Sequence, residues 1–176
     1  MEFREIYFYT STIHQWKPLL QTYNFEPIIL DSLSYLHSIG CIKVYGFVIM
    51  PNHLYLIWEL LENNGKESPA SSLMKYTAHE FKTILRVKSP RTLEEYIVDW
   101  KSRKYNFWHP KPDWFRLYKQ ETIEQKLDYI HFNPMRGKWS LVTDPVDYCY
   151  SSARFYEKGI KKYEKLVHVN DVLQQF

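Results

Sequence analysis

The chain has 176 residues and a net charge of +3, with 45% hydrophobic residues and only 5 glycines. This length fits one domain, or one domain with an appendage, and the composition predicts a packed core, which excludes the disordered class. The net charge alone is too small to indicate nucleic-acid binding. We find no charged leader and no apolar run near ~18 residues, so we expect no signal peptide and no membrane span. Cys41 and Cys149 are far apart and lack metal-ligand spacing, so we expect reduced thiols in a cytoplasmic protein.

The N-terminal half has strand patterns on either side of one helical pattern. The helical pattern has Pro27 in its first turn and Gly40 as its stop. Pro51 and Asn52 make a tight turn between two apolar runs, which indicates a hairpin. We expect, in chain order, a strand at 3–13, a helix at 27–39, and strands at 41–50 and 53–60.

The C-terminal half begins after a polar stretch at 62–71. A helix opening with "TLEE" in capping-box form is expected, and the Asn133–Pro134 pair should end a later helix. The expected elements are helices at 70–86 and 92–103, a short strand at 114–118, a helix at 122–132, and short helices near 151–157 and 170–175. This order predicts an α+β fold with an antiparallel sheet, helices on one face and the other face open.

The expected strand 53–60 has two different faces, because side chains alternate along a strand. Leu54, Leu56, Trp58 and Leu60 form one face, which is typical of a core. His53, Tyr55, Ile57 and Glu59 form the other. A histidine beside a phenol has no obvious packing purpose there.

The expected helix 122–132 also carries a polar face. Ile123, Leu127 and Ile130 lie in one apolar stripe, whereas Asn133 lies almost directly above Tyr129 on another face, flanked by Lys126. One interpretation is a functional Tyr–Asn pair. The other is an amphipathic helix with an incidental surface tyrosine and an asparagine cap.

Residues 82–119 form a stretch rich in both cations and rings. It has 10 Lys or Arg, 4 Asp or Glu, and eight aromatic residues from Tyr96 to Tyr118. Cations follow phosphates and rings stack on bases, so the stretch suits single-stranded nucleic acid. A solvated surface over a Trp-rich core fits the same residues, and the pattern alone does not choose between the two.

Four phrases in order, "VIMPNHLYLIWE", "NFWH…W", "YIHFNP" and "DYCYSSARFY", resemble the single-tyrosine HUH transposases. The closest likeness is to the REP-associated tyrosine transposase group, with an IS200-like domain. The resemblance extends from the first strand to about Tyr156. It implies a transposase-like domain at 1–156 and a C-terminal extension at 157–176.

The resemblance implies a ferredoxin-like or RRM-like sheet and a protein that nicks and rejoins single-stranded or hairpin DNA through a 5′-phosphotyrosine. By position, Tyr129 corresponds to the nucleophile, and His53 and Asn133 to ligands of a divalent metal, Mg²⁺ or Mn²⁺. It also implies a homodimer. We expect DNA contacts from the basic side chains Lys101, Arg103, Lys104, Lys126 and Arg136.

The sequence departs from the family at Tyr55, which stands where the second histidine ligand is expected. A neutral phenol is a poorer ligand than an imidazole. Three functions therefore stay open: an active nicking and joining enzyme, an impaired descendant that binds single-stranded or hairpin DNA without cutting it, and an RRM-like RNA-binding module. The third ranks last, because Tyr7, Tyr9 and Tyr45 form a possible stacking set but no RNP1 pattern is present.

Overall fold

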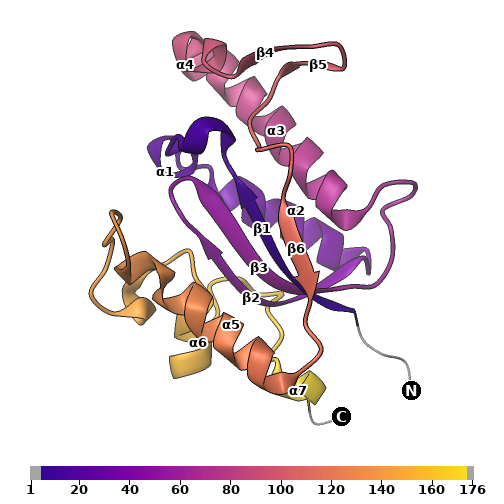
Figure 1. Cartoon of the computed structure of the whole chain (residues 1–176), viewed down its shortest axis with the longest axis vertical. Coiled ribbons are helices and arrows are strands. Elements are labelled where there is room, and N and C mark those ends of the chain that lie inside the picture. Colours follow the sequence, from indigo (N-terminus) through magenta and orange to yellow (C-terminus); the bar gives the residue numbers. More distant parts are fainter. Residues whose placement is uncertain (1–4, 174–176) are drawn as a thin grey trace.

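The computed structural model describes residues 5–173. Its centre is a four-stranded antiparallel sheet with the order β2-β3-β1-β6 (Figure 1). In this order β3 lies in the interior of the sheet. Seven residues of β1 pair with it, from Ile6 opposite Glu59 to Thr12 opposite His53. The strands are β1 (Ile6–Thr12), β2 (Ile42–Ile49), β3 (His53–Leu60) and β6 (Asp113–Arg116). The predicted α+β class and antiparallel sheet are confirmed.

Two long helices, α2 (Glu26–Ser38) and α3 (Pro69–Lys88), pack on one face of the sheet. The helix α3 begins where the sequence favours it, because Ser68 caps it by accepting a bond from the Ser71 amide and Pro69 takes the first position. The predicted core face of β3 meets these helices, and its side chains are at most 1% exposed at Leu54, Leu56 and Trp58.

The sequence predicted that the second face of the sheet is open. It is covered instead, because α5 (Gln120–Phe132) lies across it. Ile123, Leu127 and Ile130 pack there against Tyr45 and Ile57. Gly46 makes this close approach possible, since a Cβ at that position would lie 2.6 Å from Leu127 Cδ2. The prediction of helices on one face is therefore corrected to helices on both.

The C-terminal residues run along the edge of β2. Val44 bridges to Leu166 and Val48 bridges to Ser151, so the β2 edge is covered. Tyr163, a residue of the predicted extension, is buried in the core on the α2 and α3 face. The short elements are η1 (His14–Trp16), α1 (Leu19–Tyr23), η2 (Asn133–Met135), η3 (Pro145–Asp147), α6 (Ala153–Lys158) and α7 (Asn170–Leu173).

The predicted helix at 92–103 is wrong beyond its first turn. The helix α4 (Pro90–Glu94) ends early, and a hairpin follows, formed by β4 (Ile97–Trp100) and β5 (Arg103–Tyr105). The β-branched and aromatic residues of 96–100 favour a strand, and they outweigh the capping signal. This hairpin lies at the far end of α3 from α5 (Figure 1).

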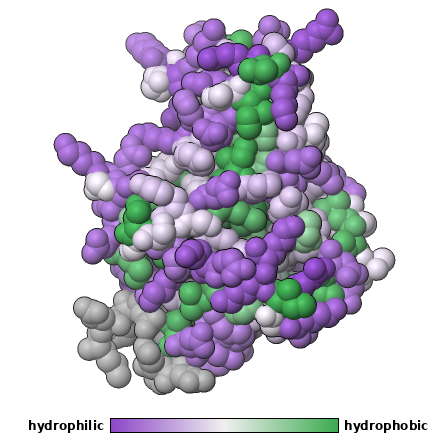
Figure 2. Space-filling model, turned by 180° about the vertical axis from the view of Figure 1, so that it is seen from behind, coloured by the Kyte–Doolittle hydropathy of each residue, from purple (hydrophilic) through white to green (hydrophobic). Residues whose placement is uncertain are grey.

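The surface seen from behind is mainly hydrophilic, with separate hydrophobic areas (Figure 2). One such area runs down from the end of the molecule that carries α4 and β4 (Figures 1 and 2). In residues 5–173, no helix combines the length and the apolar character that crossing a membrane requires. The ends predicted for the first strand and the last helix, residues 3–4 and 174–175, lie outside the described residues.

Candidate functional site

His53 stands at the start of β3, where the β2–β3 turn fixes its ring. The Asn52 amide nitrogen donates to the Trp16 carbonyl at 2.9 Å, and this turns its Oδ1 toward His53 Nδ1, 2.6 Å away. An amide oxygen only accepts, so Nδ1 carries the proton in the neutral ring. The lone pair of the neutral imidazole is therefore at Nε2. Asn52 thus orients His53, whereas the sequence indicated it only as part of a turn.

Nε2 of His53 faces Asn133, which follows directly after α5. The distance from Nε2 to the Asn133 Oδ1 is 3.3 Å. Asn133 keeps a helical backbone although Pro134 follows it, and this continues the helical path into η2. Two acceptor atoms thus lie close together, one from a strand and one from a helix end. A cation or a shared proton between them would give both atoms a partner.

The two acceptors fit part of a divalent-metal site. Neighbouring ligands of an octahedral Mg²⁺ lie about 3 Å apart, because each metal–ligand distance is about 2.1 Å. Burial lowers the pKa of His53. Asn133 Oδ1, which could accept from a protonated Nε2, opposes this and Lys138 adds to it, so the ring is neutral at pH 7. In residues 5–173 no three His, Cys, Asp or Glu side chains gather as a metal site. A metal at His53 and Asn133 would therefore take its other ligands from water and substrate phosphate, as Mg²⁺ commonly does.

Tyr129 lies on the rim of this site, on the outward side of α5. The residue is 36% exposed and its hydroxyl is 3.2 Å from the hydroxyl of Tyr55. Tyr55 touches both neighbours edge-on, with ring centroids 4.9 Å from His53 and 5.5 Å from Tyr129. The structure thus brings together the strand face and the helix face that the sequence singled out separately.

Tyr55 is a neutral phenol in this place. Burial and the Tyr129 hydroxyl both raise its pKa far above the ordinary value. A phenol held in this state is a weak metal ligand, but it remains a good hydrogen-bond partner. Its observed contact is with the Tyr129 hydroxyl, so Tyr55 acts on the position of Tyr129.

Cations surround Tyr129 and Asn133. The Lys126 amine lies 4.9 Å from the Phe8 ring centroid and 5.3 Å from those of Phe115 and Tyr129. Arg136 lies over the exposed ring of Phe132, 6.0 Å from its centroid. Lys138, which the sequence reasoning missed, is close enough to influence His53. The predicted DNA contacts Lys126 and Arg136 therefore stand next to the site.

The other three predicted contacts lie elsewhere. Lys101 is in the turn of the β4–β5 hairpin, and Arg103 and Lys104 are in β5, far from α5 (Figure 1). Arg103 and Lys104 lie over hairpin rings, at 5.7 and 5.5 Å from the centroids of Trp100 and Tyr105. The hairpin therefore does not join the His53 and Tyr129 site.

The basic and aromatic stretch 82–119 begins in α3 and α4, and the part after α4 divides into three. Phe107 and Trp108 are core residues, and the Trp108 indole donates to Thr77 Oγ1 at 2.9 Å. The hairpin forms the second part. The third is the edge strand β6, whose Trp114 and Phe115 are exposed on either side of the strand. Of the possible RNA-stacking rings, Tyr9 and Tyr45 are buried and not available to bases.

Two other ionisable side chains on β3 and α5 have partners away from the site. Glu59 is buried and accepts from the Tyr45 hydroxyl, with Lys43 3.9 Å away. His131 faces inward, where its Nε2 is 2.7 Å from Ser152 Oγ, and burial lowers its pKa to about 4. Both help to pack α5 and the sheet, and neither reaches the His53 and Asn133 pair. Cys41 and Cys149 are free thiols.

The fold and the site define an α+β protein in which an interior strand and a facing helix bring an imidazole, an amide oxygen and a phenol together. No protein-family model matches the chain, and no curated protein matches it either. Solved structures do match. One is a REP-associated tyrosine transposase bound to a REP hairpin, with a TM-score of 0.61, 18% identity, and coverage of 94% of this chain and 87% of that one.

A second match is the crystal structure of a protein described as a transposase, from Deinococcus radiodurans R1. Its TM-score is 0.45 and its identity is 15%, and the match covers 74% of this chain and 91% of that one. At identities this low, the first match demonstrates a shared fold. The fold that the sequence resemblance implied is therefore confirmed.

Proposed function

We propose that the protein is a DNA strand transferase of the single-tyrosine type, with Tyr129 as its nucleophile. One observation carries the proposal. The hydroxyl of an exposed tyrosine contacts Tyr55, whose ring packs against His53, and the His53 Nε2 converges with Asn133 Oδ1 from an element far away in sequence. A structural tyrosine on α5 would need neither the oriented imidazole nor the helix continuing through Asn133.

In the proposed reaction, the Tyr129 oxygen attacks the phosphorus of a single-stranded phosphodiester. The bond from phosphorus to the 3′ oxygen breaks, the phenol gives up its proton to water, and the leaving oxygen becomes a 3′ hydroxyl by taking a proton. The 5′ phosphate is then linked to Tyr129, and attack by a 3′ hydroxyl reverses the steps and joins the strand. A divalent cation held by His53 and Asn133, Mg²⁺ or Mn²⁺, would polarise the phosphate.

Each neighbouring residue has a distinct task in this scheme. Asn52 holds His53 in the tautomer whose Nε2 accepts, and Asn133 supplies its Oδ1 as the second acceptor of the pair. Lys126 places a positive charge beside Tyr129, where phosphate charge accumulates. Tyr55 holds the Tyr129 hydroxyl on the side of His53.

A second function is a protein that binds single-stranded or hairpin DNA without cutting it. Tyr55 favours it, because this neutral phenol takes the strand position where a second imidazole would serve the metal. The two functions use the same residues to contact DNA and differ only in the metal site. Metal binding and covalent adduct formation therefore separate them.

The proposed substrate is hairpin DNA with a single-stranded flank, since the first structural match is bound to a REP hairpin. A cytoplasmic location and a homodimer complete the proposal. Light scattering across micromolar concentrations tests the dimer: twice the chain mass supports it, and the mass of one chain contradicts it.

The deciding experiment incubates the protein with a labelled pool of hairpins and single strands, in Mn²⁺ and in Mg²⁺. A denaturing gel then detects label that remains attached to protein. Adducts in the natural protein that disappear in Tyr129→Phe support the enzyme. Binding of the pool without adducts in either metal supports the second function, and no binding of any strand overturns both.

A further inference from the structure

The amine of Lys126 lies between three aromatic rings beside the proposed nucleophile. Its Nζ is 4.9 Å from the ring centroid of Phe8 and 5.3 Å from those of Phe115 and Tyr129. Phe8 is buried, whereas Phe115 and Tyr129 are 45% and 36% exposed. The amine therefore lies next to two residues that solvent and a substrate can reach. The strand-transfer scheme gives one of them, Phe115, no task.

The Lys126 amine keeps its hydrogen-bond donors for an anion. Ring faces attract an ammonium ion, but they do not replace a strong acceptor for its three N–H donors. Among residues 5–173, no carboxylate forms an ion pair with Lys126. A half-buried cation in such a place suits a phosphate group, because a phosphate brings both the negative charge and the acceptor atoms.

Phe115 lies on the edge strand β6, which precedes α5 (Figure 1). It stands opposite Phe8 on β1, and the two ring centroids are 5.3 Å apart. The Phe8 centroid in turn is 6.2 Å from that of Tyr129. An isolated exposed ring is ordinary on a protein surface. Phe115 is different, because its ring is continuous with a cation and with the proposed nucleophile.

We propose that Phe115 and Lys126 form a nucleotide subsite next to the scissile phosphate, in which Phe115 stacks on one unpaired base and Lys126 binds a phosphate beside it. This inference rests on the proposed function, because it places a single strand at Tyr129. A ring stacks only on a base whose face is open, and in a duplex the neighbouring bases cover those faces. The subsite therefore selects a single strand over a duplex at the point of cutting. It accepts any base, since every base has a π-face.

A second copy of the chain is the competing occupant, because Phe115 is on an edge strand and an edge can pair with another strand. The charge opposes this occupant. A symmetric contact at β6 would bring the Lys126 amines of two copies toward each other, and like charges at close range cost free energy. A DNA strand meets the same cation with its phosphates.

Fluorescence anisotropy with three labelled probes of equal length tests the proposal. The probes are a twelve-nucleotide thymidine strand, a strand with the same phosphates and no bases, and a duplex. The protein carries Tyr129→Phe and the buffer contains Mg²⁺, so that strands bind without covalent attachment. Phe115→Leu should weaken binding of the thymidine strand about fivefold, and it should change the base-free strand and the duplex by less than about twofold. Lys126→Ala should weaken both single strands, because both have phosphates.

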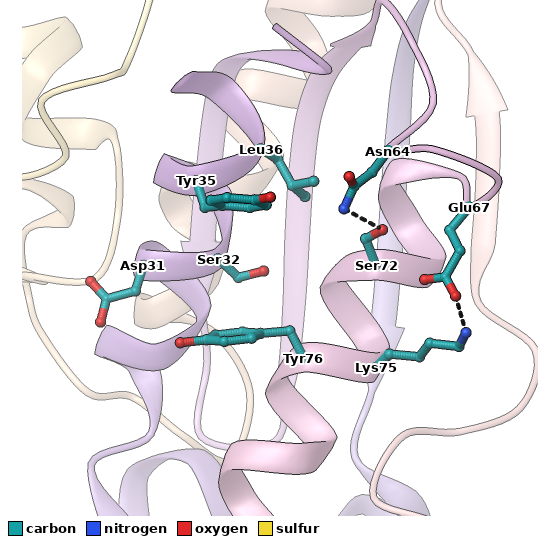
Figure 3. Close-up of a pocket in the computed structure, with 9 residues that line it drawn as sticks. All are labelled: Asp31, Ser32, Tyr35, Leu36, Asn64, Glu67, Ser72, Lys75 and Tyr76. Carbon is teal, nitrogen blue, oxygen red and sulfur yellow. Dashed lines mark hydrogen bonds and ion pairs between the residues drawn. The ribbon is translucent and has the colours of Figure 1, made fainter. Parts of the chain in front are cut away.

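Tyr76→Leu is the matched control for Phe115→Leu. Tyr76 is 46% exposed, a fraction close to that of Phe115, but it lines the cavity between α2 and α3, on the other face of the sheet (Figure 3). This change should leave all three affinities as they are. Phe115→Tyr keeps a ring at the subsite and should retain binding of the thymidine strand.

Photocrosslinking locates the base without any change to the protein. A strand with 5-iodouracil in place of thymine becomes attached, under ultraviolet light, to an aromatic ring stacked on it. The natural protein is irradiated with this strand in EDTA, and mass spectrometry of the digested protein identifies the attached residue. The expected residue is Phe115.

Three results would overturn the subsite: an equal effect of Phe115→Leu on the thymidine and base-free strands, an effect of Tyr76→Leu as large as that of Phe115→Leu, or crosslinks only at residues other than Phe115. Light scattering that gives twice the chain mass for the natural protein and the mass of one chain for Phe115→Leu would instead assign Phe115 to a second copy.

Failure of the proposed function gives different results. Adducts at Tyr129 together with affinities that Phe115→Leu leaves unchanged would overturn the subsite alone. Binding that depends on Phe115, without adducts in the natural protein, would keep the stacking subsite and overturn the strand transfer. No binding of any strand would overturn both.

Discussion

The two faces of the sheet are covered in different ways. On one face, α2 and α3 together bury the apolar side of β3, whose Leu54 and Leu56 are fully enclosed. On the other face, α5 is the one long helix, with α7 and the segment after α5 packed beside it. Along this face β3 changes from buried Ile57 to half-buried Tyr55 and His53. This cover leaves the end of β3 at His53 and Tyr55 partly exposed, as a rim. The polar groups meet at that rim.

The difference teaches why the same strand supports both a core and a site. Two helices exclude water, so that face gains stability from buried apolar area. On the α5 face, the cover is complete around Ile123 and leaves His53 and Tyr55 half-buried near Asn133. Changes at the α5 face therefore test whether the partial cover there is what makes the site.

Tyr129→Phe should have the largest effect, which is complete loss of covalent protein–DNA adducts. The change removes one hydroxyl from a partly exposed ring, so DNA affinity should stay within about twofold and the fold should be unaffected. Gel detection of adducts and fluorescence anisotropy of a labelled hairpin measure the two properties. Tyr118→Phe is the matched control, because Tyr118 is an exposed tyrosine outside the rim, and it should keep its adducts.

Gly46→Ala should weaken the docking of α5. The added Cβ would lie 2.6 Å from Leu127 Cδ2 and 3.2 Å from Ile130 Cδ1, so the free energy of unfolding should fall by about 1–3 kcal/mol. Denaturant unfolding measures it.

Leu127→Ala removes the closest of those atoms and tests the cause. The double variant Gly46→Ala with Leu127→Ala should be more stable than the sum of the two single changes predicts, because the new methyl then has room. Simple additivity would mean that Gly46 is needed for its backbone and not for the contact with α5.

Tyr55→His should strengthen the metal site. It places a second imidazole next to His53, so Mn²⁺ affinity should rise about tenfold, the order of magnitude of single changes around metal ligands. Calorimetric titration measures this, and adduct yield should rise with it. Addition of Tyr129→Phe should remove the gain in adducts and keep the gain in affinity.

An unchanged Mn²⁺ affinity in Tyr55→His would mean that the His53 side of β3 is not a metal face. Equal adduct yield in the natural protein and in Tyr55→His would show that Tyr55 serves the reaction as well as histidine does. Tyr55→Phe separates the two roles of the phenol, because it removes only the hydroxyl bonded to Tyr129.

Lys126→Ala should have a smaller effect, about a fivefold loss of hairpin affinity. One phosphate contact is lost, so the slope of log affinity against log salt should also fall by about 1. Lys104→Ala is the comparison at the far hairpin, where adduct yield should change less than in Lys126→Ala. A larger loss from Lys104→Ala would place the main DNA contact on the β4–β5 hairpin.

Much of this fold was predictable from the sequence. The alternation of 53–60 and the helical spacing of 122–132 depend on local side-chain patterns, and both elements form as expected. The hairpin at 97–105 was missed because a capping signal at 92–95 suggested a longer helix than the β-branched residues allow. Local signals of opposite meaning overlap there, and only tertiary packing decides between them.

The sequence predicted the residues of the candidate site but not the contacts between them. The strand face and the helix face each indicated polar residues, but the 3.3 Å approach of His53 to Asn133 depends on how α5 lies across the sheet. The role of Asn52 was not visible, because an asparagine after proline is typical of any turn. The separation of Lys101, Arg103 and Lys104 from Lys126 is likewise a property of the tertiary fold.

The most direct test of the central claim is to locate the DNA on the protein. A trapped adduct is digested with protease and nuclease, and mass spectrometry identifies the residue that carries the 5′ phosphate. The account predicts modification of Tyr129, in the α5 peptide, and none of Tyr55. Modification of Tyr55, or of a tyrosine away from the rim, would contradict it.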